Sequence, residues 1–136
     1  MAQAVLAARL PAVRALSAGT LALSGQPAHP RAIDVVRAAR LGDLAAHRSQ
    51  RIDPALVGGA DLVLCMQEEH RSTILERMPF AVGRVRLLAL DGGPIADPVY
   101  GEMAAFLDCL ANLRHWIDEW IEPIAALTVV RPGRHR

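Results

Sequence analysis

A continuous apolar run at 61–66 (DLVLCM) is the strongest constraint on what this chain can fold into. Its apolar residues do not alternate with polar ones, which is typical of a strand buried on both faces of a parallel sheet. A second run at 85–90 (VRLLAL) predicts the next buried strand, and an amphipathic pattern at 68–78 predicts a helix between them. A strand, a helix and a strand in this order favour a parallel sheet with right-handed crossovers.

The same alternation extends along the rest of the chain. A short strand is expected at 13–17, and Asp53 with Pro54 indicates the N-cap and first turn of a short helix. Gly42 is a suitable stop for the helix that precedes it. Further helices are predicted at 1–10, 31–41 and from 102 to about 127. The predicted fold class is therefore α/β: a doubly wound parallel sheet of three strands with helices on both faces.

Size and charge bound the possibilities further. A chain of 136 residues that is 52% hydrophobic suits one packed domain, which we expect at 1–127, with a frayed Arg-rich tail at 128–136. The formal net charge of +1 lacks the large basic surplus of a dedicated nucleic-acid binder. We therefore expect no nucleic-acid partner.

The sequence also lacks the usual targeting signals. No apolar run reaches the roughly 20 residues of a membrane-spanning helix, and Arg9 and Arg14 interrupt the N-terminal apolar stretch, which argues against a signal peptide. Cys65 and Cys109 are too few for a disulfide framework or a zinc site. We expect a protein of the reducing cytoplasm with no membrane partner and no bound metal.

Six short motifs give the chain a family resemblance. In their order and spacing the chain resembles the low-molecular-weight phosphotyrosine protein phosphatases from residue 1 to about residue 121. Each motif is modest alone, and the combination is specific. They are SAGT (17–20), GQPA (25–28), HRS (47–49), ADLVL (60–64), EHR (69–71) and DPVYG (97–101).

The resemblance implies a phosphomonoester hydrolase that works through a cysteinyl-phosphate and needs no cofactor. The family's defining loop, C-x5-R-S, precedes a helix that opens like residues 1–4 (MAQA) of this chain. The 136 residues are therefore expected to begin just after that loop. The first, central strand of the family's sheet, the nucleophilic cysteine and the phosphate-binding arginine would then all be missing. Such a chain is expected to be inactive as written.

The resemblance assigns three residues of this chain to the site. Asp97, before Pro98, matches the general acid, which protonates the leaving phenolate and later acts as base. Tyr100 and His47 match substrate-side positions, the histidine in a segment that braces the phosphate loop. Val99 stands where the family commonly carries an aromatic residue. The expected substrate of a longer, complete form is a phosphotyrosine protein.

One segment within the chain does satisfy C-x5-R-S: residues 65–72, CMQEEHRS. Glu68 and Glu69 would repel a phosphate dianion and raise the pKa of the Cys65 thiol, and the segment has no glycine with which to form an anion-binding nest. We therefore interpret Cys65 as a small buried residue of the strand.

Three functional alternatives remain open from the sequence. The first is a tyrosine phosphatase whose complete form carries the loop. The second is a non-catalytic, phosphatase-like module that binds a partner or self-associates, and a minor third is an arsenate-reductase-like protein using Cys65 and Cys109. Without its central strand the sheet would expose unpaired edges, so we expect a homodimer or a larger homo-oligomer for the chain as written.

Overall fold

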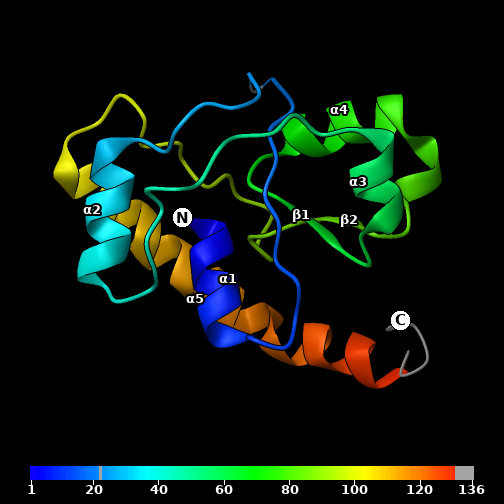
Figure 1. Ribbon diagram of the computed structural model, residues 1–136. Helices are drawn as coiled ribbons and strands as arrows, with labels where there is room; N and C mark the ends of the chain where they lie inside the picture. Colours follow the sequence, from blue (N-terminus) through cyan, green and yellow to red (C-terminus); the bar gives the residue numbers. More distant parts are fainter. Residues whose placement is uncertain (22, 131–136) are drawn as a thin grey trace.

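The computed structural model describes residues 1–21 and 23–130 (Figure 1). Within these residues three helices precede the first strand, and from that strand onward strands and helices alternate as the sequence pattern predicts. In chain order they are α1 (Ala2–Arg9), α2 (Pro30–Ala38), α3 (Pro54–Gly59), β1 (Val63–Cys65), α4 (Glu68–Arg77), a 3-10 turn (Pro79–Ala81), β2 (Val85–Leu87) and α5 (Met103–Val130).

The two strands form a parallel pair joined by α4. Their register places Val63 opposite Val85 and Cys65 opposite Leu87. The Val63 N–H donates to the Arg84 carbonyl at 2.9 Å, and the Leu88 N–H donates to the Cys65 carbonyl at 2.8 Å. This strand–helix–strand unit confirms the predicted α/β class and the predicted crossover between the two apolar runs.

Helices cover both faces of this strand pair (Figure 1). Val63, Cys65 and Val85 belong to a core shared with Val57 of α3 and Ile74 of α4. Because successive side chains of a strand point to opposite faces, the other face carries a second set. That set is packed with α1, α2 and α5: Leu62, Leu64, Met66 and Leu88.

The long helix α5 is the main support of the second face. Phe106, Leu110, Leu113 and Ile117 recur at helical spacing, and all four are buried in the larger core. Further along, the indole N–H of Trp120 donates to the Leu88 carbonyl at 2.8 Å. This bond satisfies a carbonyl just beyond β2, so α5 is fixed to the end of the sheet.

The start of α3 agrees with the sequence pattern. The Asp53 carboxylate accepts the Leu56 N–H at 2.8 Å, with Pro54 in the first turn. An acidic N-cap followed by proline supplies an acceptor for an otherwise unpaired N–H group and a backbone angle already suited to a helix.

The predicted strand at 13–17 is wrong, and only two of the three expected parallel strands are present. Burial alternates along this segment as it would in a strand, but no strand among the described residues pairs with it. Among residues 1–21 and 23–130, the bridges next to this segment are isolated: Gly19 pairs with Arg51, and Pro27 with Arg48. A strand is defined by its ladder partner, and a local pattern does not supply one.

Two helix ends also differ from the prediction. The helix α2 ends at Ala38 in a Schellman motif, in which the Leu41 N–H donates to the Val36 carbonyl and the Arg40 N–H to the Arg37 carbonyl, both at 3.0 Å. Arg40, rather than Gly42, takes the left-handed conformation that closes this motif, with φ 59°. The helix α5 runs to Val130, so 128–130 are helical, and the rest of the predicted tail, 131–136, lies outside the described residues.

Replacing Arg40 by glycine should stabilise the protein. A non-glycine residue at φ 59° crowds its Cβ against the backbone, and glycine removes that strain. We expect Arg40→Gly to raise the free energy of unfolding by about 0.5–1 kcal/mol in urea denaturation. The matched control is Ala39→Gly, whose φ of −79° suits alanine and which should lower stability by about the same amount. If the two variants changed the free energy of unfolding equally, or if Ala39→Gly were the stabilising one, this explanation of the helix end would be wrong.

Candidate functional site

A half-open pocket of about 240 Å³ lies at the N-terminal end of α1. Its walls come from α1, from the segment before α2 and from the loop between α2 and α3. The polar lining residues are Gln3, Ser17, Gln26, His29, His47 and Ser49. Helix N-termini carry unpaired N–H groups and a partial positive charge, and this pocket adds neutral hydrogen-bonding side chains around them.

Hydrogen bonds hold the pocket walls together. The Ser17 hydroxyl donates to the Gln3 side chain at 2.6 Å, and the Gln50 side chain donates to the Ser17 carbonyl at 2.9 Å. On the opposite wall the Gln26 N–H donates to the Ser49 hydroxyl at 3.0 Å, and the Ser49 N–H donates back to the Gln26 carbonyl at 2.8 Å. Residue 17 is thereby placed beside α1 although its segment belongs to no strand.

His29 connects this pocket to the start of α5. Its Nδ1 accepts the Arg31 N–H at 3.1 Å and so caps α2, while its ring lies 4.7 Å from the Phe106 ring. Arg31 also forms an exposed ion pair with Glu102 at 3.5 Å. The sequence analysis missed His29. The available signal was a residue with a side-chain acceptor directly before Pro30, the same arrangement that identified Asp53.

Asp97 lies in the loop that leads into α5. Its carboxylate is exposed and accepts the Val99 N–H at 3.0 Å, which makes an Asx turn. Gly101 follows, and its N–H donates to the Pro98 carbonyl at 2.7 Å. A Cβ at Gly101 would come within 2.5 Å of the Ala105 side chain, so glycine is required at this turn.

Two charges from outside α5 affect the thiol of Cys109 in this helix. Burial raises the pKa of the Cys109 thiol, the amino group of Met1 lowers it, and the Asp97 carboxylate raises it. Both charges therefore act on the same thiol of α5. Cys109 itself is buried in the larger core.

The structure brings some of the predicted site residues together and leaves others apart. His47 lines the pocket with Ser17 and His29, whereas Asp97 and Tyr100 do not line it. Tyr100 is fully exposed, with no neighbour packed over its ring. The polar side chains of the pocket and the Asp97 carboxylate are thus carried by separate segments. His29, which lines the pocket, contacts Phe106 of α5, the helix that follows the Asp97 loop.

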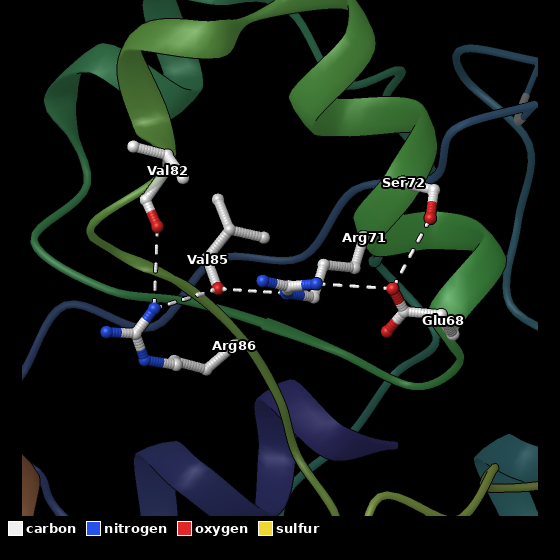
Figure 2. Close-up of polar contacts among 6 residues, drawn as sticks. All are labelled: Glu68, Arg71, Ser72, Val82, Val85 and Arg86. Carbon is white, nitrogen blue, oxygen red and sulfur yellow. Dashed lines mark hydrogen bonds and ion pairs between the residues drawn. The ribbon is translucent and has the colours of Figure 1, made fainter.

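The C-x5-R-S segment at 65–72 does not form a phosphate-binding loop, because Arg71 and Ser72 are bonded within the protein (Figure 2). Cys65 is 5% exposed, and burial raises the pKa of its thiol to about 11. Residues from Glu68 onward are already helical, and Arg71 is engaged by the Val85 carbonyl at 3.4 Å and by the Glu68 carboxylate at 3.2 Å. Ser72 contacts the same carboxylate at 3.4 Å. The geometry agrees with the interpretation of Cys65 as a buried strand residue.

The two cysteines lie in different cores. Cys65 belongs to the core under α3 and α4, and Cys109 to the core under α1, α2 and α5. Both thiols are free. A redox relay between these two thiols has no support in this arrangement.

Two further properties concern the described part of the chain. None of its helices is long and apolar enough to span a membrane. Over the same residues, no group of three or more His, Cys, Asp or Glu side chains is arranged to hold a metal ion.

The sequence of this chain is similar to those of known phosphatases. A sequence model of the family described as low molecular weight phosphotyrosine protein phosphatase matches residues 1–129. The chain is 41% identical to the probable low molecular weight protein-tyrosine-phosphatase EpsP of Ralstonia solanacearum, over 93% of this chain and 88% of that protein. It is 32% identical to the protein-arginine-phosphatase of Geobacillus stearothermophilus, over 85% of this chain and 80% of that one.

Solved structures agree with the sequence comparison. Wzb of Vibrio vulnificus, solved with benzylphosphonate, superposes with a TM-score of 0.83 at 28% identity, covering 90% of this chain and 87% of that one. The YwlE arginine phosphatase of Geobacillus stearothermophilus superposes with a TM-score of 0.84 at 30% identity, over 99% and 88% of the two chains. The α/β fold of this chain is that of the phosphatases on which it superposes. The chain belongs to the low-molecular-weight protein-tyrosine phosphatase family.

The raised pKa of Cys65 predicts how stability depends on pH. In the folded chain the thiol keeps its proton up to about pH 11, whereas the unfolded chain releases it near 9.0. The folded state therefore binds more protons between these values, so its free energy of unfolding should fall as pH rises from 9.0 to about 11. Urea denaturation followed by tryptophan fluorescence measures this slope.

The control for that experiment is Cys65→Ala. This variant should lose stability at every pH because a buried side chain becomes smaller, but its loss with rising pH should be shallower than in the wild type. Identical slopes in the two proteins would show that the Cys65 thiol does not cause the pH dependence.

Proposed function

We propose that this chain is the scaffold of a phosphomonoester hydrolase that acts on phosphotyrosine in proteins, with Asp97 as the general acid and base. One observation carries the proposal: a single family match covers residues 1–129, which include both the pocket at the start of α1 and the Asp97 loop. The pocket and the Asp97 carboxylate supply two of the parts that such chemistry needs.

The role of Asp97 follows from the chemistry of the leaving group. A phenolate leaves poorly unless it receives a proton as the phosphorus–oxygen bond breaks. The exposed carboxylate of Asp97, held in its Asx turn, can deliver that proton and then take one from the water that cleaves a phosphoenzyme. Tyr100, exposed and three residues further on, is proposed to lie against the substrate, and His47 to brace the anion pocket from its far wall.

The nucleophile is proposed to come from outside these 136 residues. Nucleophilic catalysis needs a thiolate, and a depressed thiol pKa makes one available. Burial instead raises the pKa of both Cys65 and Cys109. We therefore propose that the 136-residue polypeptide alone does not turn over substrate, and that a polypeptide also carrying a C-x5-R-S loop before α1 does.

The compartment and the substrate class are part of this proposal. Two free cysteines in separate cores suit a reducing cytoplasm. Relatives of this chain include both tyrosine and arginine phosphatases by name. Comparing a phosphotyrosine peptide with a phosphoarginine peptide of the same sequence distinguishes the two, and phosphotyrosine is the substrate we expect.

A second candidate function is self-association through the sheet. Val63 and Cys65 direct their backbone groups toward β2, so those of Leu62 and Leu64 face the opposite edge of β1. Within 1–21 and 23–130, no strand pairs with that edge. Unpaired strand edges favour pairing with another chain.

The activity proposal predicts a specific pattern of loss. The 136-residue chain should hydrolyse p-nitrophenyl phosphate no faster than buffer, and any activity abolished by Cys65→Ser would contradict our interpretation of that residue. In a polypeptide that carries the loop, Asp97→Asn should lower kcat by about 10²–10⁴-fold with a poor leaving group such as phosphotyrosine. The loss should be smaller with p-nitrophenyl phosphate, whose leaving group needs less protonation.

The matched control is Asp91→Asn. Asp91 is exposed in the same loop region and makes the same kind of turn, with its carboxylate accepting the Gly93 N–H at 2.8 Å. Because we assign it no chemical role, this variant should keep the wild-type rate. Equal losses in both variants would indicate that the loop conformation, and not proton transfer by Asp97, limits the reaction.

The association proposal is tested by the mass of the particle in solution. Sedimentation velocity on the 136-residue chain at micromolar concentration should detect a homodimer or a larger assembly. A polypeptide with an additional N-terminal strand that pairs with β1 should be less associated under the same conditions. A folded, strictly monomeric species of 14.7 kDa would overturn this second candidate function.

A further inference from the structure

The outer edge of β2 is the second free edge of the sheet. Arg84 and Leu88 exchange hydrogen bonds with Val63 and Cys65, so the backbone groups of Val85 and Leu87 point away from β1. In the described part of the chain no strand lies against them. This edge is therefore geometrically available to a strand of another molecule.

The surroundings of this edge would favour such pairing. Phe80 and Val82, in the turn before β2, are 53% and 61% exposed. Exposed apolar side chains beside an unpaired strand edge form a surface on which a second chain can add. Unless some feature blocks it, an edge of this kind would therefore favour association with another chain.

Two arginine side chains converge on the edge carbonyl of Val85 (Figure 2). Arg86 donates to it at 3.3 Å and to the Val82 carbonyl at 3.4 Å. Arg71 of α4 donates to the Val85 carbonyl at 3.4 Å, and Glu68 holds the Arg71 guanidinium at 3.2 Å. The two side chains approach this oxygen from different elements, one from the strand itself and one from the helix that covers it.

We propose that Arg71 and Arg86 form a clamp on the Val85 carbonyl that closes the outer edge of β2 to pairing with a second copy of this chain. The clamp acts in two ways. It occupies the acceptor that an added strand would use, and it places the positive charge of Arg86 at the edge, whereas Glu68 offsets the charge of Arg71. A second copy in two-fold symmetric pairing would bring its own Arg86 against the first, and like charges facing across strands oppose pairing.

The contacts explain why arginine performs this role. A guanidinium has five N–H donors in a plane and stays charged at every accessible pH. Arg86 can therefore bond two carbonyls, those of Val82 and Val85, with one group. Charged side chains on edge strands are a common defence against edge-to-edge association.

The test compares Arg86→Thr with Arg51→Thr. Arg51 is exposed in an extended segment, so its replacement makes the same change in charge and side-chain size away from β2. Sedimentation velocity and amide hydrogen exchange are measured on both variants and on the wild type, at one protein concentration and with circular dichroism as the check on folding. Arg86→Lys keeps the charge but loses the planar guanidinium, so its mass and its Leu87 exchange should lie between those of the wild type and of Arg86→Thr.

We expect Arg86→Thr to have a higher weight-average mass than the other proteins, with slower exchange of the Leu87 amide by about tenfold or more in the associated form. The Leu87 amide reports on β2 alone, so association through the β1 edge does not produce this signal. A folded Arg86→Thr with wild-type mass and wild-type Leu87 exchange would overturn the proposal. If Arg86→Thr does not fold, Arg71→Gln removes the other half of the clamp. A higher mass with slower Leu87 exchange in that variant would then support the proposal, and wild-type values of both would overturn it.

Discussion

The pairing of β1 with β2 is the constraint on which the rest of the structure depends. Two strands of three residues each bury little surface by themselves, so the pair persists only when both of its faces are covered. The alternation of Val63 and Cys65 with Leu62 and Leu64 then requires two separate apolar cores. One core needs α3 and α4, the other needs α1, α2 and α5, and the positions of all five helices follow from this requirement.

The core formed with α1, α2 and α5 positions both the pocket and the Asp97 loop. The pocket lies where α1 begins, and α1 packs against α5. The Asp97 loop lies where α5 begins, and His29 joins α2 to α5 through Phe106. Ser17, Gln26 and Ser49 lie in the long loops on either side of α2, and hydrogen bonds hold these loops to α1 and to each other.

The sequence predicted the elements whose signals are local. The apolar run at 61–66 and the cap formed by Asp53 depend on a few neighbouring residues, and both occur where expected. The strand at 13–17 and the helix end at Gly42 were wrong for different reasons. A strand needs a distant partner, and the Schellman motif of α2 was closed by Arg40 two residues earlier, at a steric cost that a pattern of residue types does not reveal. In the same way His29 was overlooked, because its contact with Phe106 joins residues that are far apart in the chain.

The bond between the Trp120 indole and the Leu88 carbonyl helps to fix the position of the Asp97 loop relative to the sheet. Between Phe106 and Trp120 the chain is one uninterrupted helix, which spans about 21 Å at a rise of 1.5 Å per residue. This part of α5 is therefore a rigid connection. Trp120 at one end contacts the carbonyl just beyond β2, and the Asp97 turn lies near the other end. Insertions or deletions in the surface loops would leave the distance from Phe106 to Trp120 unchanged. Adding or removing a single residue between them would rotate every later side chain of α5 by about 100° around the helix axis.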